Sequence, residues 1–195
     1  MTEQKSSTDL PLIELADRDA WEAWLEENHL SSPGVWLKFA KKGAPRATVT
    51  QAEAIEVALC FGWIDGQVGR VDESFYRQRF TPRRPRSKWS QINCGKALDL
   101  IDRGMMRPAG MDQVRRAQED GRWDAAYEPQ SRATVPPDFA AALAARPDAE
   151  AFFATLTGVR RYAFLYRIQD AKRPETRARR IASFVELLAE GRTLN

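Results

Sequence analysis

The sequence predicts an α+β fold that is mainly helical, with a small antiparallel sheet in the N-terminal half. Three patterns carry this prediction. Apolar side chains alternate with others at residues 35–40, two strand-like runs lie on either side of Asp72 and Glu73, and the last third of the chain shows helical apolar spacing.

The composition is typical of a folded globular protein, with 43% hydrophobic and 29% charged residues. A chain of 195 residues can bury a sizeable core in one unit. We therefore expect a single domain over residues 10–195. The alternative is a division into a mixed α/β part at 10–128 and a helical part at 137–195.

The first elements are recognised by their spacing. Residues 17–30 carry Trp21, Trp24 and Leu25 three and four positions apart, which predicts an amphipathic helix. Residues 34–43 alternate as a strand does. Thr50 and Glu53 have capping-box spacing ahead of an apolar stripe, so a further helix is expected to open there.

The segment WIDGQVGRVDESFYRQRFTPRR predicts a β-hairpin whose second strand is basic on one side. Because side chains alternate along a strand, Phe75, Arg77 and Arg79 are expected on one face, and Tyr76, Gln78 and Phe80 on the other.

Helices account for most of the remaining chain. SKWSQINCGKALDLIDRG predicts a helix with Ser87 or Ser90 as its cap, and RPAGMDQVRRAQEDG predicts a shorter one. GRWDAAYEPQSRATVPPD is rich in Gly, Pro, Ser and Thr, which is typical of a linker. Four helices are expected after it.

Several classes of function are disfavoured. The one histidine, His29, follows a helical segment, where its ring suits exposed carbonyls, and it would have to serve any triad or multi-histidine metal site alone. Cys60 and Cys94 form no C-x-x-C motif. We therefore expect no metal and no cofactor. No apolar run reaches signal-peptide or membrane-span length, so a cytoplasmic protein without a membrane span is expected.

Positive charge is concentrated in two segments. Residues 76–98 contain seven Lys or Arg and no acid, and residues 160–180 contain eight Lys or Arg against Asp170 and Glu175. The rest of the chain has 15 bases and 25 acids. Two basic segments on an acidic protein indicate an anion-facing surface.

The residues also resemble a known family. The strings FGWIDGQVGRVDESFYRQRFTPRRPRSKWSQIN, GMMRPAGMDQVRRAQEDGRWDAAY and RYAFLYRIQDAKRPETRARRI are similar to the YdeI/OmpD-associated, or bacteriocin-protection, family over roughly residues 20–190. The resemblance implies a single domain of that family and a role in stress tolerance and protection from bacteriocins. It implies no catalytic residues.

The candidate ligand-binding set combines the hairpin, the following helix start and one residue near the C-terminus. A helix N-terminus preceded by arginines is a good anion site. Arg177 lies on the apolar stripe of the last helix, so if buried it needs a partner, either an acid such as Asp65 or a bound anion. The full set is Trp63, Asp65, Arg79, Arg83, Ser87, Trp89, Ser90, Asn93 and Arg177.

Asp65 has several interpretations that the sequence leaves open. It is a candidate general base, a cation ligand or the partner of a buried arginine, and Asp-Gly is also a favoured turn pair. The helix-start residues have a structural interpretation too, as caps around a core Trp.

The function expected from these observations is binding of a small anionic or phosphate-containing ligand in stress protection. One alternative is a nucleic-acid or protein interaction module with Trp36, Tyr76 and Trp89 stacking beside arginines. Another is an enzyme that uses Asp65. Nucleic-acid binding is expected to be weak and non-specific at most. The oligomeric state is open.

Overall fold

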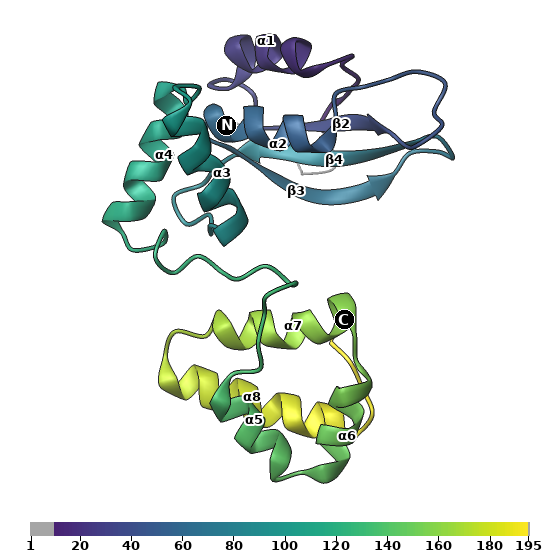
Figure 1. The fold of residues 1–195 in the computed structure, drawn as a ribbon, viewed down its shortest axis with the longest axis vertical. Coiled ribbons are helices and arrows are strands. Elements are labelled where there is room, and N and C mark those ends of the chain that lie inside the picture. The colour runs from purple at the N-terminus through teal and green to yellow at the C-terminus, as the bar shows by residue number, and fades with distance from the viewer. Residues whose placement is uncertain (1–9, 195) are drawn as a thin grey trace, which may run out of the picture. The chain divides into compact units, whose positions relative to one another are not determined.

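The computed structural model describes residues 10–194, which form two compact units (Figure 1). The first contains the described residues up to Trp89 and Asn93–Ala125, and it carries the sheet. The second contains Ser90–Ile92 and the described residues from Ala126 onward, and it is helical. The predicted α+β class is confirmed. Within residues 10–194, no helix has the length and apolar character needed to cross a membrane.

The sheet has the strand order β1-β2-β4-β3. Its strands are β1 (Leu12–Ile13), β2 (Val35–Ala40), β3 (Trp63–Arg70) and β4 (Phe75–Pro82). β4 pairs antiparallel with both β2 and β3, but β1 runs parallel to β2, so the sheet is mixed rather than purely antiparallel. The sequence did not show β1 because alternation cannot be recognised over two residues.

β3 and β4 form the predicted hairpin. The Asp72 carboxylate accepts hydrogen bonds from the backbone N–H groups of Ser74 and Phe75, both at 2.8 Å, and these bonds close the turn. Asp65 is not part of a turn, because it lies inside β3 beside a register shift between Asp65 and Val68. The turn interpretation of Asp65 is therefore wrong, and a β-bulge takes its place.

The two faces of the sheet differ as the alternation predicted. Val35, Leu37 and Phe39 of β2 lie opposite Phe80, Gln78 and Tyr76 of β4 on one face. The helices α1 (Arg18–Asn28) and α2 (Gln51–Cys60) pack on this face. The Trp21 ring lies 5.6 Å from the Phe80 ring, and its Nε1 donates to the Ala54 carbonyl at 3.1 Å.

The ends of these helices confirm the predicted caps. The Thr50 hydroxyl accepts from the Glu53 N–H, and the Glu53 carboxylate accepts from the Thr50 N–H, which completes the capping box of α2. At the end of α1, the His29 Nδ1 lies 2.8 Å from the Leu25 carbonyl oxygen. The single histidine therefore has the structural role at a helix end.

Two further helices, α3 (Gln91–Asp102) and α4 (Pro108–Glu119), follow the hairpin. α4 packs closely against the end of α2 at Gly110. A Cβ atom at Gly110 would lie 2.3 Å from the Cys60 carbonyl oxygen and 2.6 Å from that of Leu59. Only glycine lets the backbones of the two helices come this close.

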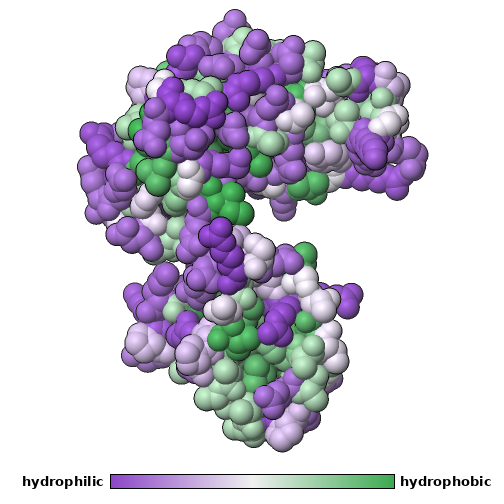
Figure 2. All heavy atoms as spheres, in the orientation of Figure 1, coloured by the Kyte–Doolittle hydropathy of each residue, from purple (hydrophilic) through white to green (hydrophobic). Residues whose placement is uncertain are grey.

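The second unit contains α5 (Pro137–Ala144), α6 (Pro147–Thr155), α7 (Gly158–Gln169) and α8 (Pro174–Ala189). Its core includes a chain of edge-to-face aromatic contacts with ring centroids 5.2 to 6.1 Å apart, formed by Phe139, Phe153, Phe164 and Phe184. Hydrophobic atoms also reach the visible surface of this unit (Figure 2), in agreement with the exposed alanines Ala140, Ala141, Ala144, Ala151 and Ala154.

Two glycine substitutions should change the stability of the first unit in opposite directions. Gly110→Ala forces a methyl group against the carbonyls of α2, so we expect a loss of about 1–3 kcal/mol. Gly95→Ala should instead gain about 0.5–1 kcal/mol, because Gly95 lies inside α3 with no atom within 4 Å of its Cβ position. Chemical denaturation of both variants measures the two shifts. Equal shifts would contradict the close α2–α4 packing.

Candidate functional site

Cationic side chains gather on the sheet face opposite α1 and α2. Trp36 and Lys38 of β2 lie opposite Arg79 and Arg77 of β4 in the register of the two strands. We call these four residues the basic face. The Arg77 guanidinium carbon lies 4.4 Å from the centre of the Trp36 ring, a cation–π contact that fixes the direction of the arginine.

Two glycines of β3 make room for the arginines. A Cβ atom at Gly69 would lie 3.3 Å from the Arg77 Nε, and one at Gly66 would lie 3.3 Å from the Arg79 Nε. Both side chains therefore lie across β3. Their Nε atoms are enclosed without a hydrogen-bond partner among the described residues, which leaves the terminal nitrogens as the exposed donors.

The charges on this side of the sheet are only partly compensated. Glu14 binds Lys38 at 2.8 Å and also pairs with Arg46. The hydrogen bonds from Arg46 and Lys38 lower the pKa of Glu14 to about 2. Within residues 10–194, Arg77 and Arg79 form no ion pair. Two adjacent guanidiniums without a carboxylate are suited to hold an anion.

The basic segment after β4 is built into the first unit instead of lying free. The Arg83 side chain is 6% exposed, its guanidinium carbon lies 3.6 Å from the centre of the Trp89 ring, and its Nη1 donates to the Lys88 carbonyl at 3.1 Å. The Ser87 hydroxyl accepts from the Arg84 N–H at 2.9 Å. Trp89 is buried against Trp123. In this structure these residues stabilise the loop between β4 and α3.

The start of α3 is also occupied. α3 begins at Gln91, so Ser90, the second of the two predicted caps, directly precedes it. Ser90 forms a β-bridge with Tyr127, and the Gln91 N–H donates to the Tyr127 carbonyl at 3.0 Å. Asn93 is partly exposed in the first turn of the helix. One of the free N–H groups that an anion would use is thus already bound.

Trp63 and Asp65 lie on the helix-covered face, away from Arg79. Asp65 lies opposite Phe80 in the register, and Trp63 is buried with its Nε1 donating to the His29 carbonyl at 3.1 Å. The Asp65 carboxylate accepts a hydrogen bond from the Gln78 side-chain amide at 2.9 Å. The partner of Asp65 is therefore an amide and not an arginine.

Arg177 belongs to the second unit and has an acidic partner there. Its Nε and Nη2 donate to the two Asp138 oxygens at 2.6 and 2.8 Å, and its Nη1 donates to the Ile168 carbonyl at 2.9 Å. The expectation of an acid beside Arg177 is met, but the acid is Asp138 and not Asp65. These bonds join the first turns of α5 and α8 to the end of α7.

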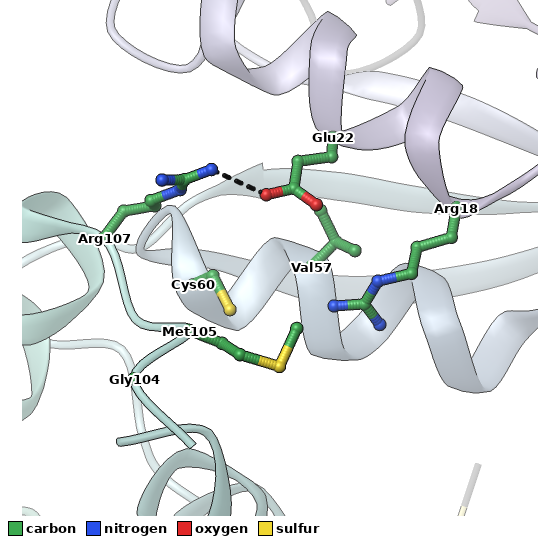
Figure 3. Close-up of a pocket in the computed structure, with 7 residues that line it drawn as sticks. All are labelled: Arg18, Glu22, Val57, Cys60, Gly104, Met105 and Arg107. Carbon is green, nitrogen blue, oxygen red and sulfur yellow. Dashed lines mark hydrogen bonds and ion pairs between the residues drawn. The ribbon is translucent and has the colours of Figure 1, made fainter. Parts of the chain in front are cut away.

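A pocket of about 200 Å³ lies in the first unit between α1, α2 and the loop before α4 (Figure 3). Arg18, Glu22 and Arg107 provide its charged side chains, while Cys60 and Met105 bring two sulfur atoms. Burial raises the pKa of the Cys60 thiol to about 11, so the thiol is neutral near pH 7. Within residues 10–194, no group of three or more His, Cys, Asp or Glu is placed to hold a metal ion.

Sequence reasoning did not include this pocket or Trp36, Lys38 and Arg77 in the ligand-binding set. The pocket joins three segments that are far apart in the chain, and no local pattern reveals it. The basic face did leave a signal, because the alternation of β4 pointed Arg77 and Arg79 to the same side. The spacing of Gly66 and Gly69 was a further signal, since glycine in a strand marks a close approach.

Comparison with known families separates the two halves of the chain. Residues 13–113 match the model of a domain of unknown function (DUF8412), and this match covers more than half of the chain. Residues 132–191 match the model described as bacteriocin-protection, YdeI or OmpD-associated (OmdA). The chain belongs to the DUF8412 family. Comparisons with curated proteins and with solved structures gave no match.

The expected YdeI/OmpD-associated family is thereby confirmed for residues 132–191. The string RYAFLYRIQDAKRPETRARRI lies inside this match. The strings around W-I-D-G and F-T-P-R lie inside the DUF8412 match instead. The candidate residues on the sheet are thus in one family domain, and Arg177 is in the other.

Replacement of Asp65 tests its hydrogen bond with Gln78. Asp65→Ala should destabilise the protein by about 1–3 kcal/mol, because it leaves the amide of Gln78, which is 3% exposed, without this acceptor. Asp65→Asn keeps an acceptor oxygen and should cost less than about 1 kcal/mol. Urea denaturation measures both, with the exposed Gln67→Ala as a matched control on the same strand. An equal cost for Asn and Ala would indicate that the charge of Asp65 is required.

The Arg177 and Asp138 pair should make stability depend on pH. Hydrogen bonds from Arg177 lower the pKa of Asp138. A lowered carboxyl pKa stabilises the fold above the ordinary Asp value, and this contribution is lost as the pH falls through the folded-state pKa. Because Asp138 is about half exposed, we expect Arg177→Gln to cost only about 1 kcal/mol at pH 7. The difference from the wild type should shrink in denaturation curves between pH 4 and pH 2, whereas the exposed Arg179→Gln should show little difference at any pH. If the stability difference between the wild type and Arg177→Gln did not change with pH, the pairing would be contradicted.

Proposed function

We propose that the protein binds an anionic, phosphate-containing ligand on the basic face, and that this binding serves the protective role that the OmdA family description names. One observation carries the proposal. Arg77 and Arg79 lie side by side on the same face of β4, and within residues 10–194 no carboxylate pairs with either.

The spacing of the two arginines suits a phosphate or a pair of phosphates. Residues two apart on one face of a strand are separated by about 6.6 Å along the strand. Guanidiniums carried by neighbouring positions of one strand face can donate to oxygens of one phosphate or to neighbouring phosphates of a diphosphate group. Trp36 holds Arg77 in place, and the two glycines of β3 position both side chains across the sheet. The site is therefore ordered before the ligand arrives, which lowers the entropic cost of binding.

The alternative of nucleic-acid binding has less support in the geometry. Of the three aromatic residues expected to stack on bases, Trp89 is buried and Tyr76 stacks on Phe39 of the helix-covered face at 5.2 Å. Trp36 alone of these three lies on the basic face. A single aromatic side chain with a few cations favours weak binding that does not depend on sequence.

The alternative of an enzyme centred on Asp65 also has less support. Asp65 lies on the face of the sheet opposite to the unpaired arginines, and its carboxylate binds the Gln78 amide. A general base needs access to the proton that it removes, and it works best beside groups that bind the substrate.

The start of α3 is left out of the proposed site, because the Tyr127 carbonyl already accepts a hydrogen bond from the Gln91 N–H, the first of the helix.

Titration of the full chain with inorganic phosphate and with pyrophosphate tests the proposal. We expect saturable binding, stronger for pyrophosphate. Arg77→Gln and Arg79→Gln should each weaken it by about 10- to 100-fold, since each removes charge-assisted hydrogen bonds. Arg103→Gln is the matched control, because this exposed arginine pairs with Asp99 in the same unit.

Binding that persists in the double variant Arg77→Gln/Arg79→Gln would refute the site. Tight, sequence-selective binding of an oligonucleotide at about 150 mM salt would favour the nucleic-acid alternative instead. Bacterial cells that express the wild type or the double variant and are then exposed to a bacteriocin test the link to protection. Equal survival of the two strains would contradict a role of this binding in protection.

A further inference from the structure

The pocket in Figure 3 has a separate chemistry from the basic face. Val57, Cys60 and Met105 form one side of the pocket, which we call its floor, and this side is apolar and polarisable because they contribute an aliphatic side chain and two sulfur atoms (Figure 3). Its rim carries both signs of charge, with Arg18 on one side, Arg107 on the other and Glu22 between them (Figure 3).

The rim charges differ in how firmly they are bound. Arg107 Nη2 donates to Glu22 Oε1 at 2.8 Å and lies 3.8 Å from a Glu26 oxygen. Among the described residues, the ionic contact of Arg18 is with Glu56 at 3.6 Å, which is too long for a hydrogen bond. Lys96 binds the same Glu56 at 3.0 Å. Arg18 therefore keeps donors available at the rim.

Glu22 keeps an acceptor available next to that donor. One of its oxygens is bound by Arg107, and the other lies on the side of Arg18 (Figure 3). A simple anion at the rim would meet this carboxylate oxygen, and a simple cation would meet Arg18. A ligand that carries both charges satisfies both groups, because opposite charges lower the cost of removing each from water.

We propose that this pocket binds a small zwitterion of the α-amino-acid class. The carboxylate of the ligand is bound by Arg18, its ammonium group by Glu22, and its apolar side chain lies on Val57, Cys60 and Met105. The volume of about 200 Å³ is below the roughly 300–1,000 Å³ of pockets for drug-sized molecules, which agrees with a ligand of this size. The neutral Cys60 thiol adds to the apolar floor.

Calorimetric titration of the full chain with L-leucine tests this inference. Two analogues remove one charge each: L-leucinamide lacks the carboxylate, and 4-methylpentanoate lacks the ammonium group. We expect saturable binding of leucine, and binding weaker by about 10- to 100-fold for each analogue, because each loses one set of charge-assisted contacts. This comparison uses the wild type alone and does not depend on how a variant folds.

Variants of the charged residues at the pocket rim provide a second test of this inference. Arg18→Gln and Glu22→Gln should each weaken leucine binding by about 10- to 100-fold, while Arg115→Gln, an exposed arginine that pairs with Asp112, should leave it unchanged. Arg77→Gln and Arg79→Gln should also leave it unchanged, so failure of this pocket and failure of the phosphate site are distinguishable. No saturable signal up to the solubility limit of leucine would overturn the inference. Equal binding of leucine and leucinamide, or leucine binding that survives Arg18→Gln, would also overturn it.

Discussion

The two-residue repeat of β4 is the constraint on which the first unit depends. Phe80 and Gln78 face α1 and α2, and Arg77 and Arg79 face the other way, so one strand carries both the core and the cationic surface. A slip of one residue in the pairing with β2 would place the arginines against α1 and α2, where an unpaired charge costs several kcal/mol. The burial of Phe80 and the presentation of the arginines therefore have the same physical cause.

Polar contacts inside the core fix this register further. Gln78 accepts a hydrogen bond from Gln51 of α2 at 2.7 Å and donates to Asp65 of β3 at 2.9 Å. These two hydrogen bonds join α2, β4 and β3 through the Gln78 amide, which is almost fully buried. A buried amide must be bonded on both sides, so it accepts only one arrangement of its neighbours. Aromatic contacts attach α1 to the same two strands, with the Trp21 ring 6.3 Å from the Trp63 ring of β3 and 5.6 Å from the Phe80 ring of β4.

The parts of the fold that were predictable from sequence are those with a local cause. The capping box of Thr50 and Glu53, the Asp72 turn and the alternation of β4 each involve residues within a few positions of one another. The carboxylate that binds Arg177 comes from 39 positions away along the chain. The partner of Asp65 comes from 13 positions away, across the hairpin. Sequence spacing says which face a side chain takes, but it does not identify a partner brought there by packing.

The register shift in β3 also matters for how copies of this protein meet one another. β3 lies at one end of the strand order, and β1 at the other end is only two residues long. An extended, regular outer strand would offer a row of open N–H and C=O groups to another chain, which is a route to aggregation. The shift between Asp65 and Val68 interrupts that row in the middle of β3. The irregularity beside the arginines therefore also interrupts the regular edge that strand-to-strand pairing between two copies would need.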